Sequence, residues 1–524
     1  MLKLPKTSYQ WALKHLVTEG DSDLFPAPFE IKAIKFNWKT LVGQLSNLDL
    51  SDHSWSGGRR FVVPKEKLAF RNATQLEPLD SLILTAIIKK YGNLIEKARI
   101  PVSENRVFSY RFDPTPDGRF YGAAMNSWHE FWENSFERAN NNKCKWVAIA
   151  DITDYYNQIY HHVLTNELSE AGLSKDLVRV IDRFLSNLTH GVSRGIPIGP
   201  HSTHLLAECA LIPVDRSLLS HGFDFCRYVD DVHFFCSSRE NAEIAIYDFA
   251  NILDKQQRLT LQKQKTEILP AKTFIKRAES MLVDRPLNFH EANIISTISK
   301  HSDGNPYAFL PLSILSEEEL ETVSSTNLIQ LFELYLTQSP VNYTRLGWLL
   351  RRLSQVGAPG AIDYLVKNIE KFTPVLGDLA RYIMRASPNY SGALENVGQL
   401  ILDALKVPLI EHSEYMQIIL LNLFTTLSGL DQIDKLTAIY RSVPPSVKRE
   451  IVVAASVAGH SHWIKERKDE FALGDPWLRR ALISAIPSLP GDEAKHWLRK
   501  IKPTMSPMEK HVARWAFHNH KMKL

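Results

Sequence analysis

Cysteine is scarce in this sequence, with four residues in 524, and no two of them form a Cys-x-x-Cys pair. That spacing excludes the common structural zinc sites and a disulfide framework, and it fits a reducing compartment. No uninterrupted apolar run is long enough to span a membrane, and the opening residues 1–6 lack the apolar core of a signal peptide. We therefore expect a cytoplasmic protein with no membrane partner.

Excess charge is also small, since the net charge is only +4. A protein that binds nucleic acid through a uniformly basic surface would carry more, so any basic surface must be local. The hydrophobic fraction of 44% and the aromatic fraction of 10% are typical of a globular protein. A chain of this length is too long for a single core, and two or three domains are expected.

Two adjacent acids, Asp230 and Asp231, interrupt an aromatic and β-branched run over 225–235. The flanks predict a buried hairpin with the acids at its tip. Adjacent carboxylates repel one another and cost free energy to desolvate, and a divalent cation removes that penalty. The alternative is an ordinary acidic surface turn.

A third acid, Asp151, ends the short apolar run 145–150, which predicts a second buried strand. Two-metal phosphoryl or nucleotidyl transfer requires carboxylates from separate elements around the same ions. The 79 positions between Asp151 and Asp230 leave room for the chain to bring them together across a sheet. This second site favours metal chemistry over the surface-turn alternative.

A Gly/Pro block lies between these acids and precedes an apolar helical stretch at 203–211. Its glycines permit close backbone approach and its prolines stiffen the loop, so it offers a surface for a base pair or template strand. The alternative is an ordinary helix-initiating turn with Ser202 as the cap. The candidate binding residues of this block are Gly195, Pro197, Gly199 and Ser202.

In chain order, four blocks resemble motifs A to D of the reverse transcriptase palm: 151–156, 195–200 with Ser202, 228–231 and 259–266. The resemblance covers roughly residues 60–300. The Gly-x-Pro-x-Gly-Pro form of the second block and the long helical tail are most similar to bacterial abortive-infection and unknown-group defence reverse transcriptases.

The resemblance implies a metal site. Asp151 and Asp230 would bind two Mg²⁺ ions, with Mn²⁺ as an alternative ion, while Asp231 would be a supporting acid and the Ile152 carbonyl would complete the ligands. Lys265 matches the motif D lysine, which protonates the leaving pyrophosphate or offsets its charge. The alternative for Lys265 is a solvated surface lysine.

The resemblance also implies contacts with dNTPs. Tyr156 matches an aromatic residue that packs under the sugar and would clash with a ribose 2′-hydroxyl; the alternative is a core tyrosine. Upstream, Lys65, Arg71 and Arg111 are candidates for cations over the triphosphate, although each alone is more often a surface charge.

After about residue 310, amphipathic helical periods replace strand-like alternation. Asp475-Pro476 predicts a helix start, and Ser506 with Glu509 predicts a capping box. The expected fold class is α+β: reverse-transcriptase fingers and palm of a right-hand polymerase, followed by an all-α helical-repeat (HEAT-like) domain. The expected domains are an N-terminal helical extension at 1–60, fingers and palm at 61–310, and at 311–524 a helical-repeat domain in place of a conventional thumb.

The leading functional hypothesis is a DNA polymerase of the reverse transcriptase type, RNA-directed or template-independent, acting in bacterial anti-phage defence. Two alternatives are a palm-fold RNA polymerase or nucleotidyl cyclase, and an RNA-binding scaffold whose catalysis is dispensable. The resemblance implies nucleic-acid partners, including a dedicated noncoding RNA and the product DNA, a homo-oligomer, and a location in the bacterial cytoplasm.

Overall fold

The computed structural model describes residues 1–122, 127–282, 288–302 and 310–519. The chain forms two compact units, each built from separate segments. The first contains residues 1–23, 38–60 and 73–285, and the second contains 24–37, 61–72 and 286–524. The units therefore divide the chain differently from the three consecutive domains that the sequence predicts, because two short N-terminal segments belong with the C-terminal helices.

The first unit holds the sheet and the helices around it. Its helices are α1 (Lys6–Thr18), α3 (Trp38–Asn47), α4 (Pro78–Ala98), α5 (Ser127–Ala139), α6 (Tyr155–Gln158), α7 (His161–Glu170), α8 (Lys175–Leu188), α9 (His201–Ala210), α10 (Ile212–Ser220), α11 (Arg239–Gln257) and α12 (Ala271–Leu282). Its sheet strands are β3 (Trp146–Asp151), β4 (Phe225–Tyr228), β5 (Asp231–Cys236) and β6 (Glu267–Pro270). A separate hairpin of β1 (Gly58–Glu66) and β2 (Ala69–Leu76) has its base in this unit and its tip in the second.

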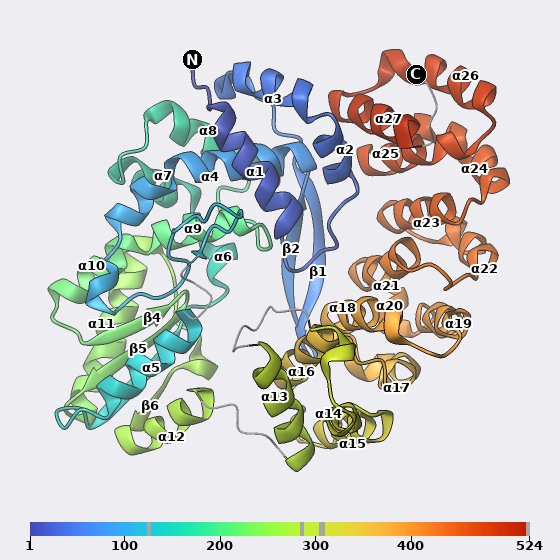
Figure 1. The fold of residues 1–524 in the computed structure, drawn as a ribbon. Helices are drawn as coiled ribbons and strands as arrows, with labels where there is room; N and C mark the ends of the chain where they lie inside the picture. The colour runs from blue at the N-terminus through green and yellow to red at the C-terminus, as the bar shows by residue number, and fades with distance from the viewer. Residues whose placement is uncertain (123–126, 283–287, 303–309, 520–524) are drawn as a thin grey trace. The chain divides into compact units, whose positions relative to one another are not determined.

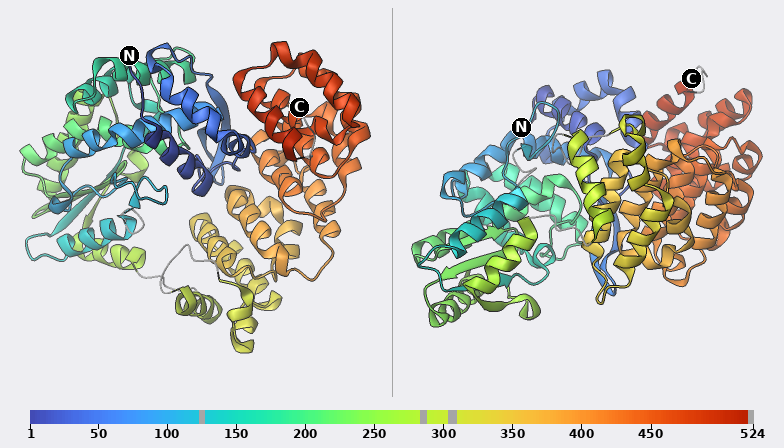
Figure 2. Two further views of the ribbon diagram at one scale, coloured as in Figure 1. Left: turned by 45° about the horizontal axis from the view of Figure 1, so that its top comes forward. Right: turned by 60° about the horizontal axis from the view of Figure 1, so that its bottom comes forward.

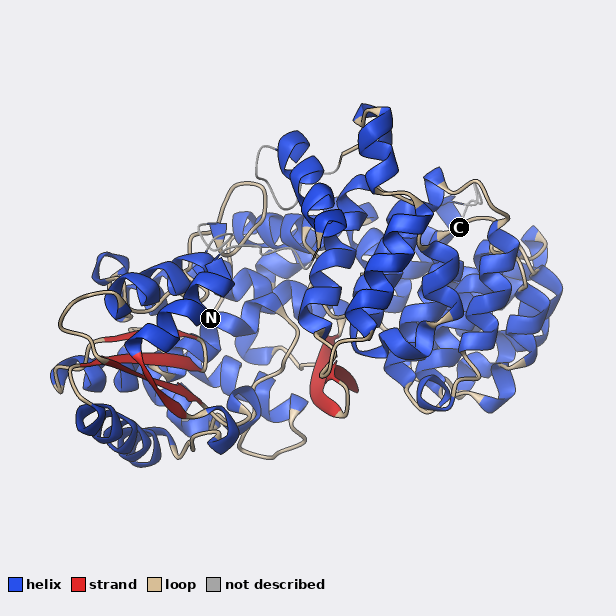
Figure 3. Ribbon diagram, turned by 90° about the horizontal axis from the view of Figure 1, so that it is seen from below, coloured by secondary structure: helices blue, strands red, loops and turns tan. Residues whose placement is uncertain are grey.

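The four-stranded sheet has the order β4-β5-β3-β6, and every neighbouring pair is antiparallel. Helix α11 packs on one face, and α5 and α12 pack together on the other (Figure 1). In the described part of the chain, extended strands are confined to this sheet and the β1–β2 hairpin (Figure 3). The strand predicted from the run at 145–150 forms as β3, and the predicted hairpin around the paired acids forms as β4 and β5, so both are confirmed.

Alternation along the strands places apolar side chains on both faces of the sheet. Val147 and Ile149 of β3 belong to a buried cluster with Phe131 of α5 and Phe274 of α12. On the other face, the ring of Phe234 packs against Phe249 of α11, with the ring centroids 5.4 Å apart. Because both faces are covered, β3 and β5 are held in a fixed register at the end where the acids lie.

Apart from the hairpin tip, the regular elements in the described part of the second unit are helices. Its helices are α2 (Glu30–Phe36), α13 (Phe289–Ser302), α14 (Glu317–Thr322), α15 (Ser325–Leu336), α16 (Tyr343–Val356), α17 (Ile362–Lys367), α18 (Leu376–Ala386), α19 (Leu394–Ala404), α20 (Pro408–Glu411), α21 (Glu414–Thr426), α22 (Ile433–Ala438), α23 (Pro445–Val457), α24 (Ser461–Arg467), α25 (Pro476–Ala485), α26 (Gly491–Ile501) and α27 (Pro507–Asn519). Helices α16, α18, α21, α23, α25 and α27 each pack on the next in that order, and Figure 2 shows their succession through the orange and red part of the chain.

The predicted helix starts of this unit are confirmed. The Asp475 carboxylate accepts hydrogen bonds from the backbone N–H groups of Trp477 and Leu478, at 2.8 and 3.0 Å. Ser506 and Glu509 form both hydrogen bonds of the capping box. No described helix of the whole chain combines the length and apolar character needed to cross a bilayer.

The N-terminal helix α2 joins the second unit through a buried ion cluster. Glu30, which is fully buried, accepts from Arg449 of α23 at 2.8 Å and from Arg480 of α25 at 2.9 Å. Burial alone would raise the pKa of Glu30, but the charges of the two arginines hold it below its ordinary value. This pairing explains why residues 24–37 belong to a unit whose other helices come more than 250 positions later.

We expect Gly398→Ala to lower the free energy of unfolding by about 2 kcal/mol. A Cβ at Gly398 in α19 would lie 2.0 Å from the backbone carbonyl oxygen of Leu430, which cannot move as a flexible side chain can. The matched control is Gly377→Ala in α18, where the nearest atom is the Tyr415 hydroxyl at 3.5 Å. Urea denaturation of both variants tests this, and equal stabilities would contradict it.

Candidate active site

Three carboxylates converge at one end of the sheet. Asp151 ends β3 and lies directly opposite Asp231, which begins β5. Asp230 lies in the turn before β5, and its backbone carbonyl accepts from the Ile152 N–H at 3.2 Å. One carboxylate oxygen from each of Asp151, Asp230 and Asp231 lies within 4.8 Å of the others. The structure therefore brings together the acids that the sequence predicts as metal ligands.

The chemistry of this donor set fits a hard divalent cation. Burial, followed by the charges of Asp230 and Asp151, raises the pKa of Asp231 to about 7. Three carboxylates this close are unfavourable unless positive charge is added, and oxygen donors are the ligands that Mg²⁺ and Mn²⁺ prefer. Asp151, Asp230 and Asp231 are thus suited to hold such ions.

Lys265 provides positive charge at this site. Its Nζ donates to Asp151 Oδ1 at 2.6 Å, while about half of its side chain stays exposed. Burial alone would lower the pKa of Lys265, but the hydrogen bond to Asp151 and the three aspartate charges raise it. The solvated-lysine alternative does not describe this contact, since the ammonium lies against a predicted metal ligand.

The segment that carries Lys265 is fixed along the edge of the acidic cluster. The N–H of Gln262 donates to the Asp151 carbonyl at 2.7 Å, and the N–H of Thr153 donates to the Thr260 carbonyl at 2.9 Å. A short 3₁₀ turn at Lys263–Lys265 follows. These backbone bonds place the lysine beside Asp151, although the two are 114 positions apart in the chain.

We expect Asp231→Asn to stabilise the protein in EDTA at pH 8. The carboxyl group has a folded-state pKa above its unfolded value, so the stability it contributes is greatest at low pH and is lost as pH rises from about 4 to about 7. An amide removes this penalty and should raise the free energy of unfolding by about 2 kcal/mol at pH 8, with a smaller gain at pH 5. Denaturation at both pH values measures this; a variant less stable than the wild type at pH 8 would contradict it.

The backbone turn that contains Asp230 is held by hydrogen bonds to a buried network of charged and polar side chains. Val229 has a φ of 54°, a left-handed conformation that a β-branched residue rarely adopts. The Val229 N–H donates to the Ser109 hydroxyl at 2.9 Å, and the Val229 carbonyl accepts from Arg227 at 2.8 Å. A strained turn held on both sides fixes the position of the next residue, Asp230.

Arg227 is the centre of this network and is completely buried. It forms two hydrogen bonds of 2.7 Å to Asp215 of α10 and one of 2.9 Å to Glu208 of α9. Glu208 also accepts from Ser109 at 2.6 Å and from Arg99 at 2.7 Å. Burial alone would lower the pKa of Arg227, but the two carboxylates raise it, so the guanidinium stays charged.

Sequence reasoning missed this network, although a signal was present. Arg227 is a charged residue inside an otherwise apolar strand, and a buried charge requires a partner. The partners Asp215 and Glu208 lie on two helices upstream, and neither the sequence spacing nor the residue type identified them.

The Gly/Pro loop packs beside α6, the short helix that follows Asp151 in the chain. Gly195 and Gly199 have φ values of 104° and 125°, which favour glycine. The Gly195 N–H donates to the Ile159 carbonyl at 2.8 Å, and the Ile196 N–H donates to the Tyr156 carbonyl at 2.8 Å. The Pro197 carbonyl accepts from the Thr203 hydroxyl at 2.8 Å, which ties the loop to α9.

Ser202 lies inside α9 rather than at its start. The helix begins at His201 with Pro200 as its N-cap, so the interpretation of Ser202 as a cap is wrong. Its side chain is buried, with 1% of its surface exposed. The nucleotide contact of Ser202, like those of Gly195, Pro197 and Gly199, stays a prediction.

Tyr156 lies in α6, five positions after Asp151, and is half-buried. Its hydroxyl is hydrogen-bonded to His204 Nδ1 of α9 at 2.8 Å. The preceding residue, Tyr155, is fully packed, and its hydroxyl donates to the Ala207 carbonyl at 2.5 Å. The two tyrosines thus differ: Tyr155 is a core residue, while Tyr156 is half-buried and contacts the Gly/Pro loop through its backbone.

The three residues predicted to contact the triphosphate belong to different units: Arg111 to the first, and Lys65 and Arg71 to the second. Arg111 is buried, pairs with Glu96 at 2.9 Å and donates to the Ile100 carbonyl at 2.8 Å. Its guanidinium is paired with Glu96, which is itself partly exposed, and its contact with a triphosphate stays a prediction. Lys65 and Arg71 belong to the second unit, and their contacts with a triphosphate stay predictions.

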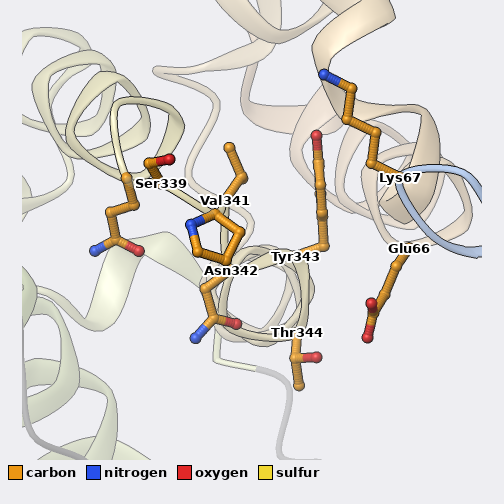
Figure 4. Close-up of a pocket in the computed structure, with 9 residues that line it drawn as sticks. Glu66, Lys67, Ser339, Val341, Asn342, Tyr343 and Thr344 are labelled. Atoms are coloured by element: carbon orange, nitrogen blue, oxygen red, sulfur yellow. The ribbon is translucent and has the colours of Figure 1, made fainter. Parts of the chain in front are cut away.

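A cavity of about 750 Å³ lies in the second unit, beside the tip of the β1–β2 hairpin (Figure 4). It is lined by Glu66 and Lys67 of the hairpin and by residues 338–344. None of the candidate site residues lines it, and the catalytic argument does not depend on it.

A known protein family matches the part of the chain that carries the three acids. Residues 81–287 match the model of the family described as "Reverse transcriptase (RNA-dependent DNA polymerase)". No curated protein sequence matches the chain.

Solved structures with similarity to the chain include telomerases from two Candida species. Telomerase from Candida albicans with a fragment of telomeric RNA is 12% identical, covering 74% of this chain and 70% of that chain with a TM-score of 0.31. Apo telomerase from Candida tropicalis is 9% identical, covering 93% and 73% with a TM-score of 0.33.

Proposed function

We propose that this chain, a nucleotidyltransferase with a reverse transcriptase domain at residues 81–287, synthesises DNA from dNTPs. The proposed reaction is two-metal nucleotidyl transfer. The observation that carries the proposal is the convergence of Asp151, Asp230 and Asp231 within 4.8 Å. Asp151 and Asp231 lie on two strands that a sheet register holds opposite each other, and Asp230 lies in the adjacent turn.

In this proposal Asp151 and Asp230 hold two Mg²⁺ ions, or Mn²⁺, with Asp231 beside them and the Ile152 carbonyl as a further ligand. When bound, such ions lower the pKa of an attacking hydroxyl and offset phosphate charge. Lys265 starts against Asp151 and is half-exposed. Its flexible ammonium can leave Asp151 once other positive charge is present, and it then offsets or protonates the leaving pyrophosphate.

The preference for dNTPs is assigned to Tyr156. The Tyr156 backbone lies next to the loop that begins at Gly195, because its carbonyl accepts from the Ile196 N–H, and its half-buried ring contacts His204. A ring at the sugar of the incoming nucleotide leaves no room for a 2′-hydroxyl. The Gly195–Ser202 loop, stiffened by its backbone bonds, is the proposed surface for the template base pair.

The biological role follows from the resemblance to bacterial defence enzymes. We propose anti-phage defence in the bacterial cytoplasm, with a homo-oligomer that binds nucleic acid, including a dedicated noncoding RNA and the product DNA. The ordered packing of α16, α18, α21, α23, α25 and α27 supports a HEAT-like helical-repeat domain in place of a thumb. Both RNA-directed and template-independent synthesis are compatible with the site.

Incorporation assays with the purified full chain test this function. We expect extension of a nucleic-acid primer, or labelling of the protein itself, with dNTPs and Mg²⁺, and loss of both in EDTA. Sequencing the product separates copied RNA from template-free synthesis. Incorporation of NTPs in preference to dNTPs would replace the proposal with an RNA polymerase, and no incorporation of either with Mg²⁺ or Mn²⁺ would favour the scaffold.

A further inference from the structure

His204 forms the contact that fixes the tyrosine ring proposed to select the sugar. Its Nδ1 is 2.8 Å from the Tyr156 hydroxyl, and the two rings meet edge to face with their centroids 5.9 Å apart. Burial raises the pKa of Tyr156 well above its ordinary value, so the phenol keeps its proton and donates it to the imidazole. The His204 tautomer that accepts this bond carries its proton on Nε2.

The imidazole is itself held in place. The Tyr110 ring lies parallel to the His204 ring, with an angle of 6° and a centroid distance of 4.1 Å. Tyr110 has a φ of 44°, and its carbonyl accepts from Arg99 at 2.9 Å. Arg99 is part of the buried ion network that also holds the Asp230 turn. A rigid support of this kind limits how far His204 can move.

Tyr156 is therefore constrained at both ends. Its hydroxyl is bound to His204 on α9, and its backbone carbonyl is bound to the Ile196 N–H of the Gly/Pro loop at 2.8 Å. A ring without the first of these bonds could rotate about χ1 and χ2 and open space beside the sugar. A phenylalanine would fill the same volume without such a bond, so the hydroxyl has a separate role.

We propose that His204 is a specificity-determining positioning residue, which holds the Tyr156 ring where it excludes a ribose 2′-hydroxyl. This inference rests on the proposed function, since it requires that Tyr156 faces the sugar of the incoming nucleotide. His204 acts through Tyr156 and stays outside the reacting atoms. Exclusion of the 2′-hydroxyl then depends on the orientation of the Tyr156 ring as well as on its size.

The test compares kcat/KM for a dNTP with kcat/KM for the matching NTP, using the purified full chain. His204→Leu should reduce the preference for the dNTP by about three- to tenfold, the value of one orienting hydrogen bond. The change should come mainly from a higher kcat/KM for the NTP. A residue with only a structural role would lower both values together and leave their ratio unchanged.

Two polar replacements form a matched pair. His204→Asn places an amide oxygen near the position of Nδ1 and should restore most of the discrimination, whereas His204→Gln extends past that position and should not. Tyr156→Phe, which removes only the hydroxyl, should reproduce the loss seen with His204→Leu. The double variant should then lose no more than either single variant, because both remove the same bond.

The possible outcomes are separable. An unchanged ratio in both His204→Leu and Tyr156→Phe overturns the role of His204, and if His204→Leu fails to fold, Tyr156→Phe decides alone. Tyr156→Ala tests the underlying function: if its ratio equals that of the wild type, or the wild type does not prefer dNTPs, the sugar contact itself is wrong. Reduced discrimination in Tyr156→Ala, His204→Leu and Tyr156→Phe, with recovery in His204→Asn, supports both.

Discussion

The Asp230→Asn variant is expected to lose nucleotide incorporation by at least about a thousandfold. Its carboxylate is one of three within 4.8 Å, and an amide supplies neither the charge nor the second strong oxygen donor that divalent ions require. Loss of several kcal/mol of transition-state stabilisation corresponds to a factor on the order of 10³. Steady-state incorporation of a labelled dNTP with Mg²⁺ measures the effect.

This loss should occur without unfolding. The Asp230 carbonyl still accepts from the Ile152 N–H, and Val229 keeps its backbone hydrogen bonds to Ser109 and Arg227. None of these bonds involves the Asp230 carboxylate. Removing one of three crowded negative charges should leave the free energy of unfolding unchanged or higher. The matched control is Asp254→Asn on α11, where the side chain is 63% exposed and outside the cluster. Residual incorporation above about a tenth of wild type would show that the cluster is not the catalytic centre.

The acidic site was predictable because local sequence pattern determines its geometry. The apolar run before Asp151 and the hairpin around Asp230 both indicate strands with acids at their ends. Antiparallel pairing of those strands then has one register that puts the apolar side chains on the covered faces, and it places Asp151 opposite Asp231. Lys265 was assigned only by resemblance, and the structure places it at Asp151.

The remaining features depend on partners far away in the chain. Arg111 was predicted to bind phosphate by resemblance alone, and nothing in its local sequence indicates that it pairs with Glu96, 15 positions earlier in the chain. His204 has no local signal either, since its partners Tyr156 and Tyr110 come from different segments. Glu30, near the N-terminus, pairs with two arginines of the C-terminal helices, and no periodicity in either segment indicates this.

Replacing Arg227 by methionine is expected to have the largest effect on stability. The change leaves the carboxylates of Asp215 and Glu208 buried, without the guanidinium that forms hydrogen bonds of 2.7–2.9 Å to them. Breaking a buried charge cluster by removing one partner costs about 3–5 kcal/mol. Urea denaturation should show a fall of that size in the free energy of unfolding of the first unit.

The exposed pair of Arg239 and Glu243 on α11 provides the control. Arg239 is 66% exposed, so Arg239→Met should change stability by less than about 0.5 kcal/mol. A second comparison separates charge from packing. Adding Asp215→Asn to Arg227→Met removes one of the stranded charges and should recover part of the loss.

Arg227 should also affect incorporation below the unfolding transition, since its guanidinium donates to the carbonyl of Val229, the residue before Asp230. Without that bond the strained turn can relax and move Asp230 relative to Asp151. The activity of Arg227→Met, measured at low temperature where the variant is folded, should therefore fall by at least about tenfold. Adding Asp215→Asn to Arg227→Met should restore stability more than activity. Wild-type stability and activity in Arg227→Met would mean that the turn holds its conformation without the buried cluster.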